Sequence, residues 1–250
     1  ALFPHHPYGT QTVLGTQEHL KNPSITNVKN YHKTYYVPNN IAICLSGDFD
    51  PETMIATIDK YFGDMEPNEN LPELQFEPEQ PITSPVVREI FGPEAENITL
   101  GWRLPAATDH SWDVAEIVGS ILYNGQAGLI DLDLVQQQKV LSAYGYASSQ
   151  PDYGTFLVAG RPKAGQTLDQ VRDLLLGEVA KLRTGDFDEK LIAATINNLK
   201  KYQMLSYESN ESRADMYVHS FINGSEWADD IRTLDRMAKV TKEDVVAWAN

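Results

Sequence analysis

Apolar residues recur every three or four positions along much of the chain, and this spacing predicts amphipathic helices. We expect helices over residues 25–37, 51–62, 111–123, 168–184, 188–199, 211–221 and 226–238, with a short one from Leu129 and a last one from Thr241. Residues that commonly cap a helix, Ser24, Asp50 and Thr167, stand at three predicted starts. Gly63 and Gly185 follow two of the predicted ends.

Shorter apolar segments, some alternating with polar residues, predict β-strands. We expect strands over residues 41–45, 86–91, 97–103, 142–149 and 155–160. In the third of these, Ile98, Leu100 and Trp102 occupy alternate positions, as in a strand with one buried face. The order of strands and helices favours an α+β fold, in which helices cover one side of a mixed or antiparallel sheet.

Residues 64–85 separate a smaller front part of the chain from a larger rear part. This segment holds five prolines and six acidic residues and no basic residue. Such a composition predicts an extended, solvated connector.

The charge balance restricts the classes of partner. The 250 residues include 35 acidic and 20 basic side chains, for a formal net charge of −15. This charge repels nucleic acid and anionic membranes and favours cationic or neutral partners. We therefore expect no nucleic-acid partner, and charge alone assigns no basic substrate. No apolar run approaches the roughly 18 residues of a membrane-spanning helix.

Cys44 is the single cysteine, so an internal disulfide is excluded. Its place in the apolar run 41–45 predicts a buried, unreactive thiol. The compartment stays open, because one cysteine fits the cytoplasm and is compatible with the periplasm. The chain begins at Ala1 without an initiator methionine and no signal peptide opens it, and it stops within a predicted helix. We expect it to be a segment of a longer protein.

The histidines do not form a recognisable zinc motif. They are His5, His6, His19, His32, His110 and His219. A zinc site commonly uses ligands three or four residues apart on a helix, and no H-x-x-H, H-x-x-x-H or C-x-x-C occurs here. Glu18-His19 matches the end of the inverted motif H-x-x-E-H, but the first histidine of that motif would fall on Gly15.

Other motifs of catalysis and ligand binding also fail. Asp48-x-Asp50 does not continue as a calcium-binding loop, because Thr53 and Asp59 occupy the positions of its glycine and glutamate. No phosphate-binding loop and no G-x-S-x-G nucleophile motif is present. Asp131 and Asp133 are interpreted as part of a solvated helix face.

These failures predict no catalytic residue and no metal ligand in this chain, and substrate-binding residues stay unassigned. The loop from Gly47 to Asp50 is interpreted as a joint between a strand and a helix rather than as a binding loop.

This joint belongs to a series of motifs spread over the chain. In order they are Phe3-Pro4-x-His6-Pro7-Tyr8-Gly9, Leu14-Gly15-Thr16, Tyr36-x-Pro38-Asn39-Asn40, Gly47-Asp48-Phe49-Asp50, Tyr61-Phe62-Gly63, Ile121-Leu122-x-Asn124-Gly125, Ala127-Gly128-Leu129-Ile130 and Tyr153-Gly154-x-Phe156. Together they resemble the pitrilysin/insulinase family of zinc metallopeptidases, which includes mitochondrial processing peptidase and its non-catalytic core-protein relatives. The order of the motifs is more specific than any one of them.

The resemblance implies α+β units, each a sheet covered by helices, that pair around a closed peptide chamber in the full protein. It implies zinc held by an H-x-x-E-H motif and a distant glutamate, with the glutamate of the motif as general base. These groups would all precede Ala1, so zinc is expected in the parent protein and not in this segment. Residues 1–23 would end the catalytic-type domain, and residues 24–250 would form the second domain of one half.

One departure from the family pattern bears on which half this is. In the substrate-clamping half, an arginine and a tyrosine follow the glycine-rich turn, in a pattern like L-R-x-x-x-x-L-x-Y. Here Gln136 stands where the arginine is expected, and Tyr144 fits only with a shift of one residue. The departure favours the non-clamping second domain of a catalytic half, although an inactive half would look similar.

The leading hypothesis is a non-catalytic supporting or substrate-chamber domain of a zinc metalloendopeptidase that hydrolyses peptides or small proteins. Its partners would be the preceding zinc-binding domain and a second homologous half or subunit. The alternative is an inactive half or subunit that acts as a structural, peptide-binding partner of a catalytic subunit. A third hypothesis is an unrelated α+β binding module. An H-x-x-E-H motif upstream would distinguish the first two.

Overall fold

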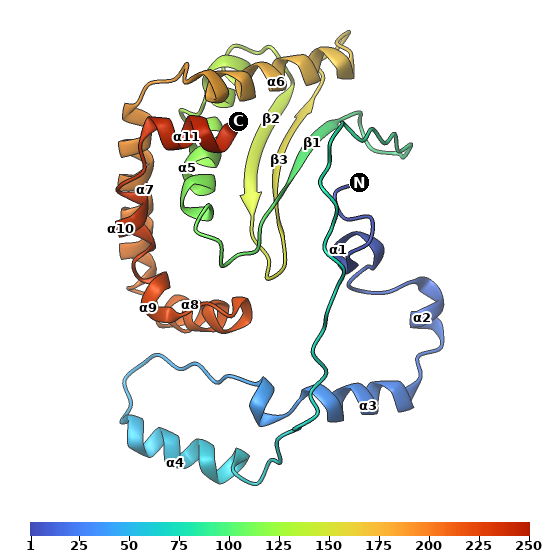
Figure 1. Ribbon diagram of the computed structural model, residues 1–250, viewed down its shortest axis with the longest axis vertical. Helices are drawn as coiled ribbons and strands as arrows, with labels where there is room; N and C mark the ends of the chain where they lie inside the picture. Colours follow the sequence, from blue (N-terminus) through green and yellow to red (C-terminus); the bar gives the residue numbers. More distant parts are fainter. The chain divides into compact units, whose positions relative to one another are not determined.

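The computed structural model describes residues 1–250, and the chain divides into two units, Ala1–Phe91 and Gly92–Asn250. The first unit contains α1 (Pro7–Thr10), α2 (Gln17–Lys21), α3 (Ile25–Tyr35), η1 (Pro38–Asn40) and α4 (Pro51–Phe62). The second unit contains β1 (Ile98–Leu104), α5 (Trp112–Leu122), η2 (Asp131–Val135), β2 (Ser142–Ser148), β3 (Gly154–Arg161), α6 (Leu168–Thr184), α7 (Lys190–Ser206), α8 (Asn210–Asn223), α9 (Trp227–Asp230), α10 (Thr233–Met237) and α11 (Lys242–Ala249). Figure 1 shows these elements.

The second unit is built on a three-stranded antiparallel sheet with the order β1-β3-β2. The register pairs Trp102 and Ala147 with Phe156, and it pairs Leu100 with Val158. Because neighbours across strands share a face, these side chains lie on one side of the sheet. The alternation predicted for residues 97–103 and the antiparallel α+β fold are both confirmed.

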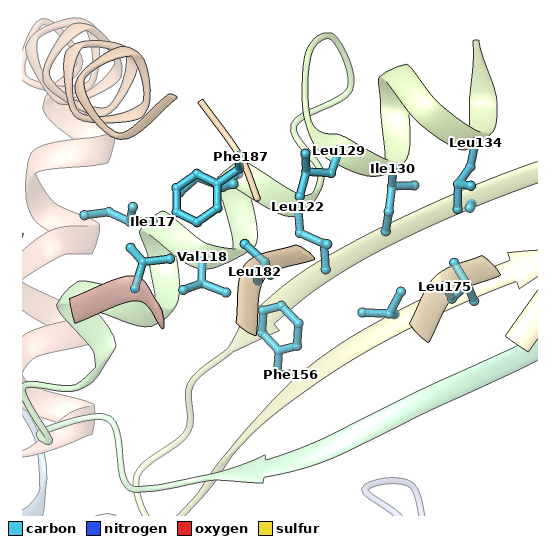
Figure 2. Close-up of a cluster of buried hydrophobic side chains, with 14 of the residues drawn as sticks. Ile117, Val118, Leu122, Leu129, Ile130, Leu134, Phe156, Leu175, Leu182 and Phe187 are labelled. Atoms are coloured by element: carbon cyan, nitrogen blue, oxygen red, sulfur yellow. The ribbon is translucent and has the colours of Figure 1, made fainter. Parts of the chain in front are cut away.

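Helices α5, α6 and α11 pack on this inner face of the sheet and enclose one hydrophobic core. Figure 2 shows Phe156 among side chains from α5 and α6. The fully or almost fully buried members of the core are Ile117, Val118, Ile121, Leu122, Ile130, Leu134, Val158, Val171, Leu175, Leu182 and Val245. The opposite face of the sheet has no such cover, because Tyr144 and Tyr146 on β2 are exposed.

Local signals start and end the helices of both units as predicted. The hydroxyl of Ser24 accepts a hydrogen bond from the backbone N–H of Asn27 and starts α3. Thr167 and Gln170 form a reciprocal capping box at the start of α6, and Gly185 ends that helix in the left-handed conformation, with φ 72°.

The connector over residues 64–85 contains no helix or strand, as predicted, but it is anchored at two places. Asn68 accepts from and donates to Asn39 with both distances at 3.0 Å, and it also donates to the Thr34 carbonyl. Glu79 accepts hydrogen bonds from the backbone N–H groups of His5 and His6, both at 2.8 Å. Glu79 is buried, so the prediction of a fully solvated connector is wrong at this residue.

Two predicted strands are wrong. Residues 41–45 and 86–91 belong to no strand ladder. Apolar side chains in both segments are exposed: Ile43 is 45% exposed and Ile90 is 92% exposed. A strand requires a neighbour that supplies backbone hydrogen bonds, and no such neighbour exists for these segments within the described chain. For the same reason Cys44 is only partly buried, contrary to the prediction.

Three helix predictions also change. The region before residue 24, where no helix was predicted, contains the short helices α1 and α2. The short helix predicted from Leu129 is a π-helix, η2. The helix predicted over 226–238 is broken into α9 and α10, because the Asp229 carbonyl accepts from the Arg232 N–H and from the Arg236 side chain, both at 2.9 Å. None of the helices combines the length and apolarity needed to cross a membrane.

We predict that Ile121→Ala lowers the free energy of unfolding of the chain by about 2–4 kcal/mol, because it leaves a cavity in a fully buried site. Urea denaturation followed by circular dichroism measures this change. Leu141→Ala is the matched control, since Leu141 is mostly exposed and its loss should have a small effect. Equal effects of the two substitutions would contradict the position of the core.

Candidate functional site

The loop from Gly47 to Asp50 leads into α4, as predicted, but no strand precedes it. Asp50 accepts hydrogen bonds from the backbone N–H of Thr53 at 2.8 Å and from its hydroxyl at 2.7 Å. These bonds favour the charged carboxylate and lower the pKa of Asp50. Pro51 occupies the first turn of α4. The predicted N-cap is confirmed, and the charge of Asp50 is used to start a helix.

The histidines are dispersed among local structural roles. His6 is buried, and its Nδ1 atom accepts from the backbone N–H of Tyr8 at the start of α1. The Nδ1 atom of His19 accepts from the Thr16 N–H at the start of α2, and the ring of His32 stacks on Tyr36. No group of three or more His, Cys, Asp or Glu side chains is arranged to hold a metal ion.

The glycine-rich turn after α5 is closed by two polar side chains. Asp131 Oδ2 accepts from the N–H groups of Asn124 and Gly128, both at 3.0 Å. Asn124 Oδ1 accepts from the N–H groups of Gln126 and Ala127 at 3.0 and 2.8 Å. Asp131 is only 5% exposed, so its predicted place on a solvated face is wrong. Its carboxylate replaces the backbone partners that the turn lacks.

Gln136, at the position where the clamping pattern has an arginine, serves this same turn. Its side-chain amide donates to the Gln126 carbonyl at 2.9 Å. Gln138, two residues on, adopts a left-handed backbone with φ 52°. The side chain of Tyr144 lies on the exposed face of β2. Gln136 therefore stabilises the turn, whereas Tyr144 belongs to the exposed face of the sheet.

The uncovered face of the sheet carries aromatic side chains that are exposed, Tyr144 and Tyr146. Tyr144 and Tyr146 stack side by side along β2, with ring centroids 6.2 Å apart and planes 13° apart. The register places Leu157 beside Tyr146 on the same face. Arg103, on β1, lies over the ring of Tyr153 at 5.8 Å. The alternation of small and aromatic residues along 142–148 is the sequence signal for this face, and no prediction was based on it.

Two basic side chains of the second unit, Lys181 and Arg236, each bind one buried carboxylate and one more exposed carboxylate. Lys181 donates to Asp133 at 2.6 Å and to Glu178 at 2.8 Å. Burial raises the pKa of Glu178, and the opposing effect of Lys181 is smaller. For Lys181 itself burial lowers the pKa, but hydrogen bonds and charges from Asp133 and Glu178 outweigh burial and raise it.

Arg236 forms the second such network. Its Nε and Nη2 atoms contact the two carboxylate oxygens of Asp113, at the start of α5, at 2.5 and 3.3 Å. Its Nη1 atom contacts Asp229 at 2.9 Å. The Asp113 hydrogen bond makes the largest contribution to a raised pKa of Arg236. The pair joins α10 to α5 across 123 positions of sequence.

Residues 24–199 match the protein family described as the peptidase M16 inactive domain. Among related sequences, zinc protease PqqE of Helicobacter pylori is 23% identical over 222 residues, covering 86% of this chain and 48% of that protein. The uncharacterized zinc protease YmxG of Bacillus subtilis is 26% identical over 216 residues, covering 85% of this chain and 51% of that protein. The chain thus spans about half the length of these relatives.

Solved structures with the same fold include a protease from Helicobacter pylori, with a TM-score of 0.89 at 18% identity, covering 99% of this chain and 60% of that one. A peptidase M16 inactive domain from Pseudomonas fluorescens gives a TM-score of 0.78 at 16% identity, covering 99% of this chain and 58% of that one. At this identity the similarity concerns the fold. Together with the family match, it confirms the resemblance carried by the sequence motifs.

We predict that Arg236→Leu lowers the free energy of unfolding by about 2–4 kcal/mol, because it leaves the buried Asp113 carboxylate without its cation. Arg172→Leu is the matched control, since the ion pairs of Arg172 with Asp169 and Asp173 lie at the surface. Thermal unfolding of the two variants measures the difference. A loss as large for Arg172→Leu would argue against a special role of Arg236.

The raised pKa of Glu178 predicts a pH dependence. In the folded chain the Glu178 carboxyl group keeps its proton to a higher pH than in the unfolded chain, where its pKa has the ordinary value of 4.5. The free energy of unfolding should therefore fall as pH rises from 4.5 through the folded-state pKa. Glu178→Gln removes the titrating group. The free energy of unfolding of this variant should therefore not fall over the same pH range.

Urea denaturation of both proteins over a series of pH values measures the effect. Glu243→Gln is the control, because Glu243 is exposed in the first turn of α11. Parallel stability profiles for the original chain and Glu178→Gln would contradict the assignment.

Proposed function

The chain belongs to the peptidase M16 family as an inactive domain, and we propose that it is a non-catalytic supporting part of a zinc-dependent metalloendopeptidase. In the parent protein, zinc would be held by another domain and would activate water for attack on a peptide carbonyl. The residues described above bind backbone groups and one another, which leaves this chain a scaffolding role. The names of the two zinc proteases among its relatives support this assignment.

The observation that carries the proposal is that the first unit lacks a hydrophobic core of its own. Val37 is the only apolar side chain of this unit that is buried. Ile41, Ile43 and Leu45, spaced two apart as in a strand, are all exposed. Segments of this kind gain little stability unless another surface covers them. We infer that the preceding domain of the parent supplies a sheet edge for residues 41–45.

The helix that leads into this segment repeats the pattern of α11. The matching positions are Ser24 and Thr241 at the cap, Val28 and Val245 four residues on, and Tyr31 and Trp248 seven residues on. In the second unit, Val245 is fully buried and the ring of Trp248 packs against Phe156 at 5.6 Å. In α3 the matching Val28 and Tyr31 are exposed. The pattern supports a partner that presents a sheet-and-helix surface like that of the second unit.

The uncovered sheet face of the second unit is the proposed peptide-facing surface. Stacked tyrosines offer a rigid aromatic surface that contacts apolar and polar side chains alike. Such a surface suits a chamber wall that accommodates varied peptides. A second homologous half or subunit would close the chamber, and residues 1–23 would belong to the preceding catalytic-type domain.

We predict that the purified chain binds no stoichiometric zinc and does not cleave a flexible fluorogenic peptide, whereas the parent protein does both. Elemental analysis and fluorescence measure the two properties. Zinc binding or cleavage by the chain alone would overturn the proposal. If the parent itself lacks H-x-x-E-H and is inactive, the chain comes instead from an inactive, peptide-binding half of a two-part enzyme.

We predict that Ile43→Asp destabilises the parent and reduces its peptidase activity, because a charge would enter the proposed strand interface. The same substitution in the 250-residue chain should leave its unfolding nearly unchanged, since Ile43 is 45% exposed there. Thermal unfolding of both proteins provides the comparison. Equal effects in the chain and the parent would contradict burial of this segment by the preceding domain.

A further inference from the structure

The second unit contains a concave pocket that none of the functions above uses. It has a volume of about 670 Å³ and is lined by residues of the loop before α5 and of α5, α8, α9 and α10. This volume lies in the range of about 300–1,000 Å³ that is typical of ligand sites. The walls combine aromatic, apolar and charged side chains, including Trp227, Met216 and Met237.

The charged groups of the pocket are strongly unbalanced. Its ionisable lining residues are Asp109, Asp113, Glu116, Glu226, Asp229, Asp230, His110, His219 and Arg236. Six of these are carboxylates and one is an arginine. A concave site lined by one sign of charge concentrates the opposite charge.

Several of these carboxylates are already engaged. Arg236 binds Asp113 and Asp229, as described above. Asp109 accepts from the Ser111 N–H at 2.8 Å, and Asp230 accepts from the Ser225 hydroxyl at 2.7 Å.

Glu116 and Glu226 are the two lining carboxylates outside these contacts. Of the two, Glu116 lines the pocket from the first half of α5, and no hydrogen bond or ion pair joins its side chain to another group. Its side chain stays accessible from the pocket, yet burial by the surrounding protein raises its pKa. A carboxylate that is accessible, partly desolvated and without a cation is one whose charge an incoming cation would stabilise.

An aromatic wall adds a second kind of contact. Trp227 lines the pocket, and its ring is held against Tyr217 with centroids 4.1 Å apart. Flat cations such as guanidinium bind well to indole rings. Arg236 provides a precedent in the same pocket, because its guanidinium is bound by two of the lining carboxylates. Carboxylates and an aromatic ring around one cavity therefore favour a second guanidinium group.

We propose that this pocket binds the side chain of an arginine in a peptide segment, with Glu116 as its carboxylate partner and Trp227 as its aromatic wall. The site lies wholly within the second unit. It is independent of the proposed scaffolding function, which concerns the first unit and the uncovered sheet face.

The test is a titration of the ¹⁵N-labelled chain with the peptide acetyl-Gly-Arg-Gly-amide, followed by NMR of the tryptophan indole N–H groups. The indole signal of Trp227 should shift and saturate. The same peptide with citrulline, which keeps the shape of arginine and lacks its charge, should cause no such shift. An equal response to both peptides, or no response to either, would overturn the proposal.

Two variants locate the binding. Glu116→Gln should weaken binding about five-fold, the effect of losing one partly exposed ion pair. Trp227→Leu should weaken it as well. Glu96→Gln is the matched control, because it removes one negative charge at an exposed position outside the pocket. The amide spectra verify that each variant is folded. Equal weakening by Glu116→Gln and Glu96→Gln would show attraction by net charge alone and would overturn the site.

Discussion

Antiparallel pairing of β3 with both of its neighbours is the interaction on which the second unit depends. This pairing gives hydrogen-bond partners to the backbone of β3 on both sides. It also sets the register that places Phe156 and Val158 on the inner face of the sheet. Helices α5, α6 and α11 can bury that face only because the register makes it continuous. The segment over residues 41–45 has the same kind of apolar sequence without a neighbour, and its side chains stay exposed. Strand pairing thus distinguishes the second unit, which has a hydrophobic core, from the first unit, which has none.

Most polar residues that invited a chemical interpretation are used to satisfy backbone groups. Asp50 starts α4, His6 starts α1, and Asp131 closes the glycine-rich turn. A buried backbone N–H group without an acceptor costs free energy comparable to a lost hydrogen bond. Side chains that accept from such groups therefore stabilise the fold. The carboxylates and imidazoles named here therefore serve the local structure of this chain. The membership in the peptidase M16 inactive-domain family agrees with this physical description.

The acid excess also shapes the interior. The chain has 35 acidic and 20 basic side chains, and some basic side chains each bind two carboxylates. Lys181 binds Asp133 and Glu178, and Arg236 binds Asp113 and Asp229. This sharing offsets part of the desolvation of the buried acids. The pocket beside Arg236 holds more carboxylates than its one arginine can bind, which leaves room for a cation from outside.

Local sequence determined most of the helices, their caps and the strands of the second unit, because capping and periodicity act over a few residues. Ser24, Asp50, Thr167 and Gly185 each appear where the pattern predicted. Apolar pattern alone could not tell that residues 41–45 lack a strand partner, since pairing depends on segments far away in sequence or outside it. Only the tertiary structure decided that Asp131 is buried, that Arg236 divides the predicted last long helix, and that a pocket forms around Glu116. These features arise from contacts between distant parts of the chain, and no local spacing encodes them.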